Sequence, residues 1–468
     1  MKIKITNLGP IKDATLDIGK RLTVFCGPNN SGKTYVAFLI YSLTELGAAG
    51  VSLRDSNNIH LSIKDLIKNK KSIIKIDVED LWKYRTSEIE TIRKSLNSIY
   101  GISNETVEKL FGEFNLEILE TKAQLKKNIK SMSFDHTMPV GDSLSLKITK
   151  KASATDIEVS ALGDKITKEN IRYIELFLQG QLMALMAFYP FTSSHILPVE
   201  RNSIYTFSKE LSLKKQEFVD KAQALNTNGS KDSFHWLMKR ATRYPMAIRD
   251  GLQISEDLSN FSMQKTDFHN FAEEIEQVLL QGKVSVTKEG EVQFASDKAK
   301  RKKIPIHLSA SIVKTLSGLV FYLKYMATKN DLIIIDEPEL NLHPNNQVIL
   351  ARIFAKMLNK GFRLLISTHS DYIIRELNNL MMLSSAKEGI EDIIKKYNYS
   401  ADEKINPEQV SAYLFNYKGK AKSVTVNPIP ITEEGFEVVT IDHTIDKLNE
   451  ISEELFYTLK YGVSEQVE

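Results

Sequence analysis

The 468-residue sequence predicts an α/β fold whose mixed or parallel sheet is interrupted by a large, mainly helical insertion. Three observations lead to this prediction. Residues 22–46 have the pattern of a strand, a glycine-rich loop and a helix. Residues 313–368 alternate helices with buried strands, which favours parallel pairing because parallel strands need crossover connections. Residues 51–138 are rich in Lys, Glu and spaced apolar residues, which predicts helices with short breaks.

The first 50 residues predict three short strands, a loop and a helix. Apolar residues alternate near the N-terminus, and glycines at positions 9 and 19 separate the strands. The loop GPNNSGKT follows the third strand, and the helix after it ends at Gly47.

The middle of the chain predicts two further segments. Residues 139–204 contain a hairpin near 143–161, an amphipathic helix at 171–185 and a strand at 194–199 that ends in PVERN. Residues 205–285 predict a helical arm or hairpin, because Phe268, Phe271 and Ile275 fit one helix face.

The last two segments contain most of the remaining strands. Residues 286–400 begin with two strand-like pieces around the basic turn DKAKRKK and continue with alternating helices and strands. Residues 401–468 predict a β-rich tail and a final helix at 445–460.

Composition sets limits on function and location. The sequence is 42% hydrophobic and has 62 Lys and Arg against 59 Asp and Glu, so a net charge of +3 does not by itself favour a polyanionic partner. Its one cysteine, Cys26, excludes an intrachain disulfide. No secretory signal and no apolar run of membrane-spanning length is visible, so we expect a cytoplasmic protein without a membrane partner.

The loop matches the phosphate-binding pattern G-x-x-x-x-G-K-[ST] at every fixed position. Its glycines let successive backbone N–H groups face the phosphates of ATP. We expect Lys33 to reach the β- and γ-phosphates and the Thr34 hydroxyl to ligate Mg²⁺. The expected nucleotide-binding residues are Gly27, Pro28, Asn29, Asn30, Ser31, Gly32, Lys33 and Thr34.

An apolar strand that ends in two carboxylates predicts the part of the site that binds the metal ion. LIIIDE places Asp336 where it would hold Mg²⁺ and Glu337 where it would polarise the attacking water. The loop and this strand lie about 300 residues apart, far more than one crossover needs. A third strand, LLIST, ends at His369, which we interpret as a γ-phosphate sensor although a single histidine is usually structural.

GPNNSGKT, LIIIDEPELNLHP and LLISTHS, in this order around an insertion, resemble the ABC-type ATPases of the SMC, RecF and overcoming-lysogenization-defect (OLD) group. The resemblance is closest to the stand-alone ATPases of bacterial anti-phage systems such as PARIS, Septu and retron-associated defence. It implies an ABC-type P-loop NTPase head with Glu337 as catalytic base, His369 as switch histidine and Lys33 in catalysis. It also implies two ATP molecules held between two heads, with Pro338 to Pro344 at the interface.

The resemblance further implies a signature helix that completes the partner's site. HLSASIVKTLSGL supplies Ser309, Ser311 and Lys314, but the transporter form LSGGQ is absent, which favours the OLD-like branch; an ordinary serine-capped helix is the alternative. Arg201, in LPVERN, stands where this group often has a residue that couples the head to the insertion.

Two other features favour structural roles. The basic run from Lys298 to Lys303 could contact a nucleic-acid backbone, yet such a turn is more often simply solvated. The acidic residues Glu434, Asp442 and Asp446 lack the spacing of a TOPRIM nuclease site, so we interpret the tail as structural and the chain as free of nuclease activity.

These features predict an ATP-driven switch in anti-phage defence. Two heads would close on ATP and the insertion would transmit closure to a separate effector, which we expect to be a nuclease triggered by a nucleic acid or a phage protein. The alternative is a RecF-like DNA-repair ATPase that binds DNA directly. A transporter subunit is disfavoured by the missing LSGGQ and the long insertion.

Overall fold

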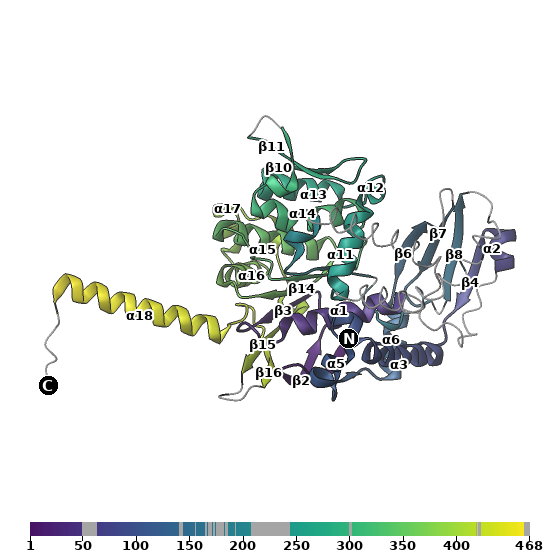
Figure 1. Cartoon of the computed structure of the whole chain (residues 1–468), viewed down its shortest axis with the longest axis horizontal. Coiled ribbons are helices and arrows are strands. Elements are labelled where there is room, and N and C mark those ends of the chain that lie inside the picture. Colours follow the sequence, from purple (N-terminus) through teal and green to yellow (C-terminus); the bar gives the residue numbers. More distant parts are fainter. Residues whose placement is uncertain are drawn as a thin grey trace, which may run out of the picture.

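Figure 1 shows the structure, a computed structural model of the whole chain. It describes residues 1–48, 63–139, 144–154, 156–163, 186–191, 193–206, 244–298, 302–417 and 423–462, with isolated positions between 166 and 182 and at 419. The predicted amphipathic helix at 171–185 therefore lies largely outside the described residues. So does the first half of the predicted helical arm, residues 207–243.

A nine-stranded sheet organises the described part of the chain, in the order β5-β1-β2-β16-β15-β3-β14-β13-β9. Five neighbouring strands run parallel to one another: β15 (Val410–Tyr417), β3 (Leu22–Cys26), β14 (Arg363–Thr368), β13 (Leu332–Asp336) and β9 (Ser194–Leu197). Beyond β15 the sheet contains antiparallel pairs, so it is mixed. The predicted fold class is confirmed.

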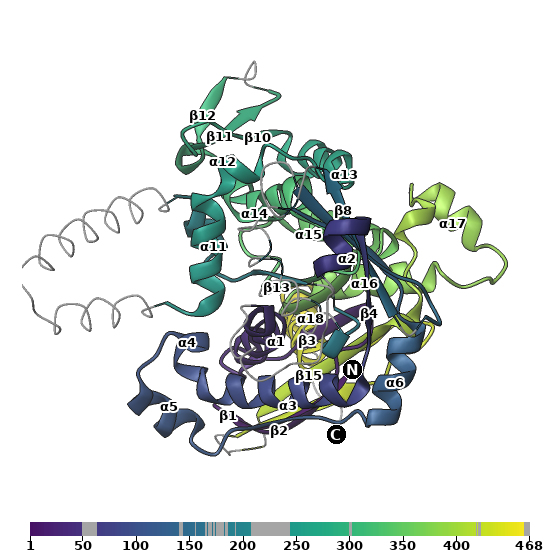
Figure 2. The same ribbon diagram turned by 90° about the vertical axis from the view of Figure 1, so that its right-hand side faces the viewer.

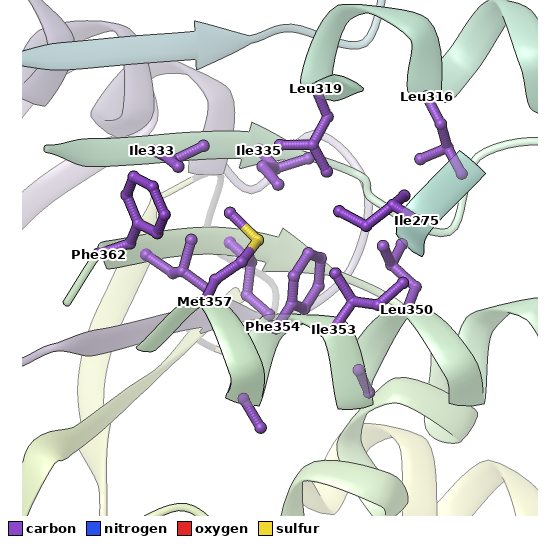
Figure 3. Packing of buried hydrophobic residues seen from close by; sticks show 14 of the residues in the cluster. Ile275, Leu316, Leu319, Ile333, Ile335, Leu350, Ile353, Phe354, Met357 and Phe362 are labelled. Atoms are coloured by element: carbon purple, nitrogen blue, oxygen red, sulfur yellow. The ribbon is translucent and has the colours of Figure 1, made fainter. Parts of the chain in front are cut away.

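The central strands are mainly apolar because helices cover both faces of the sheet. Every residue of β3 and β13 is buried. On one face lie α13 (His269–Ile275), α14 (Ser311–Tyr325), α15 (Pro344–Asn359) and α16 (Asp371–Met382). Figure 3 shows Phe354 and Met357 of α15 in this core, close to Ile333 and Ile335 of β13.

The opposite face is covered by the helix that follows the loop and by part of the insertion. Its core combines residues of α1 (Lys33–Ala48), α3 (Val78–Lys94), α4 (Leu96–Tyr100) and α11 (Met246–Glu256) with the alternate residues of the same strands. α1 begins at Lys33, inside the loop motif, and its predicted extent of 35–46 is confirmed to within two residues.

The prediction of a mainly helical segment at 51–138 is wrong in part. The described residues contain α2 (Ile63–Asn69), α3, α4, α5 (Asn104–Phe111) and α6 (Lys122–Ser131), but also three strands. β4 (Lys71–Lys75) joins β8 (Asp156–Gly163), β7 (Leu144–Lys150) and β6 (Phe134–Pro139) in a second sheet, and β5 (Asn115–Ile118) pairs with β1 (Lys2–Leu8) at the edge of the main sheet. KSIIK alternates over only five residues within a Lys-rich context, too few to distinguish a strand from a helix. The predicted hairpin near 143–161 is confirmed by the β7–β8 pair.

The predicted arm at 205–285 is also wrong in its second half. Here α11, α12 (Leu258–Phe261), α13 and the π-helix Glu276–Leu280 pack on the head rather than forming a separate arm. β10 (Gly282–Val286), β11 (Val292–Ser296) and β12 (Lys303–Pro305) then form a three-stranded sheet at the end of the molecule opposite to α3 and α5 (Figures 1 and 2). The basic turn between β11 and β12 lies partly outside the described residues.

The predicted tail at 401–468 is not a separate unit. Its strands β15 and β16 (Val424–Ile429) lie inside the main sheet, between β3 and β2 (Ile11–Asp17), so they complete the head. After β16 the final helix, α18, runs over Val439–Tyr461 and projects from the body (Figure 1). Among the residues described, no helix combines the length and apolar character needed to cross a membrane.

Substitution of Phe415 tests whether the tail belongs to the head. This β15 residue is fully buried, and its ring centre lies 5.0 Å from that of Phe25 on β3. We expect Phe415→Ala to lower the free energy of unfolding by about 3–5 kcal/mol, because it leaves a cavity beside the central strand. Urea denaturation would measure this loss. Met263→Ala, at a position 79% exposed, is the control and should change the value by less than about 0.5 kcal/mol. Equal effects of the two substitutions would contradict the placement of β15.

Candidate functional site

The predicted site residues converge at one edge of the main sheet. Because β3, β14, β13 and β9 run parallel, the loop after β3, the carboxylates at the end of β13 and the histidine after β14 all lie at the carboxyl ends of these strands. In an open parallel sheet, this edge is where ligands bind. β14 lies between β3 and β13, so the loop and the acidic strand face each other across one strand.

The glycine-rich loop has the backbone conformation that its sequence requires. Gly27, Asn30 and Gly32 have φ values of 135°, 61° and 90°, in or near regions where a residue with a bulky side chain would be strained. The ammonium of Lys33 donates to the carbonyl oxygens of Gly27 and Pro28, at 3.0 and 2.9 Å, and is only 6% exposed. Burial lowers the pKa of Lys33.

The tail strand β15 holds this loop from one side. A Cβ atom at Gly27 would stand 2.1 Å from the carbonyl oxygen of Phe415, so only glycine fits there. The Tyr417 hydroxyl donates to the carbonyl oxygen of Asn30 at 2.9 Å. Cys26, directly before the loop, is a buried strand residue whose pKa burial raises to about 12, so its thiol stays neutral.

The two predicted metal-binding residues are in direct contact. Thr34 donates its hydroxyl to Asp336 Oδ2 at 2.7 Å, and Ser367 donates to the other carboxylate oxygen. Burial raises the pKa of Asp336, while these two hydrogen bonds oppose the increase. A hydroxyl and a carboxylate beside a phosphate-binding loop fit Mg²⁺, which takes few protein oxygens and completes its shell with water and phosphate.

Glu337 and His369 form the second pair. Glu337 Oε1 lies 3.6 Å from His369 Nε2, and the adjacent imidazole is the main cause that lowers the pKa of Glu337. The glutamate is therefore ionised at neutral pH. Its φ of 49° is unusual for a residue with a side chain, and strain of this kind concentrates at functional sites.

Arg201 fixes the backbone of both carboxylate residues. It is 2% exposed, and its guanidinium donates to the carbonyl oxygens of Asp336 and Glu337, each at 2.6 Å, and of Pro198 at 3.0 Å. Burial lowers the pKa of Arg201 to about 10, although the negative charge of Asp336 acts to raise it. The guanidinium therefore remains cationic at neutral pH. The arginine thus links the segment after β9 to the end of β13.

Sequence reasoning missed a glutamate that orients the histidine. Glu339 accepts from the backbone N–H of His369 at 2.6 Å and from the Thr368 hydroxyl at 2.9 Å. Burial raises its pKa, and the hydrogen bonds that it accepts partly offset this effect. Ser367 was also missed, although a polar residue in the apolar strand LLIST was a usable signal. No motif marked Phe415 or Tyr417.

The predicted signature residues are not part of this cluster. Ser311 begins α14, while the Ser309 hydroxyl donates to the carbonyl oxygen of Ile306 at 2.6 Å, within its own turn. Leu308, just before them, is 66% exposed, so the start of α14 faces solvent. A role in completing the site of a second copy stays a prediction.

Comparisons with known proteins identify the family of this chain. No curated protein sequence matches the chain. Three solved structures align over most of it: an SmcHead bound to the C-winged helix domain of ScpA (12% identity, 92% of this chain and 98% of that chain, TM-score 0.36); an Smc head with an extended coiled coil bound to the C-terminal domain of ScpA, from Pyrococcus furiosus (12%, 96% and 98%, 0.32); and an SMC head domain from Thermotoga maritima (10%, 92% and 98%, 0.28). TM-scores this low support no conclusion.

The family model described as an AAA ATPase domain, AAA_15, gives the stronger result, because it matches residues 1–374. That range includes the glycine-rich loop, both carboxylates at the end of β13 and the histidine after β14. The chain therefore belongs to the AAA_15 family of ATPase domains.

Proposed function

We propose that this chain binds and hydrolyses ATP with Mg²⁺ at the carboxyl edge of its main sheet. The observation that carries the proposal is the contact between Thr34 and Asp336, which joins segments about 300 residues apart in a geometry that suits a metal and a phosphate. P-loop ATPases use a hydroxyl and a carboxylate of this kind to hold Mg²⁺.

The loop and the N-terminus of α1 bind the nucleotide. Backbone N–H groups of the loop and the N-terminus of α1 attract the phosphates, and Lys33 adds a positive charge beside them. Thr34 and Asp336 would hold Mg²⁺, which supplies charge neutralisation on the phosphate oxygens when it is bound. Ser367 keeps the Asp336 carboxylate in place through its hydrogen bond.

Hydrolysis falls to Glu337. Its lowered pKa keeps the carboxylate ionised, so it can accept a hydrogen bond from a water molecule and orient it. The proton of this water would pass to the carboxylate as the water attacks the γ-phosphate. His369 holds this carboxylate from one side, and Glu339 fixes His369 through the backbone. Arg201 sets the backbone position of Glu337.

We further propose that two copies enclose ATP between them. The exposed start of α14, with Ser309, Ser311 and Lys314, would meet the γ-phosphate of the partner's nucleotide through hydroxyl and N–H groups. Closure would then be driven by ATP and reversed by hydrolysis.

The switch would act in the cytoplasm in anti-phage defence, where it controls a separate effector, most simply a nuclease. The support is the resemblance of the loop, acidic-strand and histidine motifs to the ATPases of such systems. Copurification from cells that carry the native operon tests this role: recovery of a nuclease supports it, whereas direct, nuclease-free DNA binding by the purified chain favours a RecF-like repair role.

Lys33→Ala is expected to weaken ATP binding by about 10- to 100-fold or more, because a charge-assisted contact with phosphate contributes about 1.5–3 kcal/mol. Isothermal titration with a non-hydrolysable ATP analogue measures this loss. Lys12→Ala, at an exposed lysine of β2, is the matched control and should bind as the parent does. Unchanged affinity of the Lys33 variant would overturn the nucleotide site.

Glu337→Gln is expected to lower kcat for ATP hydrolysis by about 10²- to 10⁴-fold, since the amide cannot accept the proton, while ATP affinity stays near that of the parent. ATP should then trap a dimer that light scattering detects. Glu200→Gln removes an exposed carboxylate from the segment after β9 and should hydrolyse ATP normally. Hydrolysis by Glu337→Gln at the parental rate would contradict the assignment.

Arg201→Met tests whether Arg201 positions Glu337 for hydrolysis or only stabilises the fold. The variant leaves buried carbonyl oxygens unpaired, at a cost of about 1–3 kcal/mol in unfolding free energy. It should also lower kcat, with little change in ATP affinity, because the phosphate loop is untouched. Arg85→Met is the control, since Arg85 is equally buried and donates to the carbonyl oxygen of Ala187, which belongs to neither the phosphate loop nor the strand ends of the ATP site. If both variants lose stability and neither loses kcat, Arg201 has no role in positioning Glu337.

A further inference from the structure

The final helix, α18, carries an exposed apolar stripe. In the described part of the chain none of its residues is buried, and Figure 1 shows the helix projecting from the body. Leu448 and Leu455 are both 59% exposed, and Leu459 is 88% exposed. Exposed apolar surface in a continuous stripe marks an interaction site more often than scattered single residues do.

The stripe has the spacing of a two-stranded coiled coil. Its core positions are separated by four and three residues in alternation, as the faces of paired helices require. These positions are Ile445, Leu448, Ser452, Leu455 and Leu459. Ile441 continues the spacing, but it packs against the core of the head. Ser452 is the one polar member, and the stripe from Ile445 to Leu459 is about 21 Å long.

The charges of α18 identify the kind of partner. Positions that flank the stripe are mostly neutral: Thr444, Ile451 and Thr458 on one side, and Asp442, Asn449 and Phe456 on the other. The carboxylates of Asp446, Glu450, Glu453 and Glu454 lie on the opposite face by helical periodicity. An identical helix can therefore pack against the stripe with few like charges in contact. A membrane surface fits poorly, because helices that lie on anionic lipid have a Lys- and Arg-rich polar face.

The base of α18 is attached to the helix that follows the switch histidine. Asn378 of α16 exchanges two hydrogen bonds with the backbone of Phe436, at 2.8 and 3.1 Å, and its side chain fills the space beside Gly435. Arg375 of α16 pairs with Asp371, and the nearby carboxylates of Asp442 and Asp446 also help to raise the pKa of this arginine. α16 begins two residues after His369, so the segment just before α18 contacts the helix that starts at the ATP site.

We propose that α18 pairs with α18 of a second copy of this chain as a parallel two-stranded coiled coil that forms without nucleotide. The parallel orientation rests on the proposed function, because it places both heads at the same end of the pair, where they can close on ATP. Five core positions form a small interface, so the contact alone gives a concentration-dependent dimer and the heads add to it when ATP is bound.

Sedimentation of the full chain without nucleotide tests the pairing. We expect mass to rise with concentration from 53.1 kDa towards that of two copies. Leu455→Glu should weaken this association about 30-fold or more, because it places two carboxylates in the core of the pair. Tyr457→Glu introduces the same charge on the opposite face, at a position of similar exposure (52%), and should associate like the parent. A parent that stays monomeric over the whole range, or equal behaviour of the two variants, overturns the proposal.

A cysteine variant tests the orientation. Only buried Cys26 competes for oxidation, so Leu455→Cys should form a disulfide-linked dimer through position 455 of both copies if the helices are parallel. Absence of this product, with the dimer still present by sedimentation, overturns the parallel arrangement. The ATP-dependent head dimer is measured separately in the combined Leu455→Glu and Glu337→Gln variant. If that variant dimerises only with ATP, the head contact exists independently of α18; if it never dimerises while the parent does so without ATP, the proposed head contact fails and the pairing of α18 stands.

Discussion

The pairing of β3 with a parallel strand on each side is the constraint on which the rest of the structure depends. β14 brings the histidine segment to one side of β3, and β15 brings the tail to the other. Because β3 is hydrogen-bonded on both sides, its position is fixed, and so is the start of the loop that follows it. β15 also lies so close to the loop that Gly27 has no room for a side chain beside Phe415. The position of the loop is therefore set by the two neighbours of β3.

Buried hydrogen bonds orient the two carboxylate residues of the site, which apolar packing alone cannot do. Thr34, Ser367 and Arg201 converge on Asp336 and its neighbour Glu337 from three different segments. Each of these contacts replaces hydration that burial removes, so the network is stable only when it is complete. The unusual backbone of Glu337 persists because hydrogen bonds hold it from both sides, one from Arg201 to its carbonyl oxygen and one from its own N–H to Ser367.

The proximity of the predicted site residues could be inferred from the sequence, whereas the order of several strands around them could not. The loop, Asp336, Glu337 and His369 follow apolar strands in recognisable patterns, and parallel pairing brings the ends of such strands together, so their proximity could be inferred. Short strands in Lys-rich context, such as β4, gave no such signal. The position of β15 could not be inferred either, because strand order depends on non-local packing rather than on local pattern. Glu339 was within the predicted interface segment, but its bond to His369 depends on a turn that no residue type specifies.

The central position of β15 also affects the order in which the protein can be made. Synthesis produces β3 and its loop first, yet one neighbour of β3 ends at Thr368 and the other at Tyr417. A ribosome must therefore synthesise the chain through β15 before the strand that carries the nucleotide loop is paired on both sides. Until then one edge of an apolar strand is left unpaired, so the head cannot complete its folding before β15 has been made.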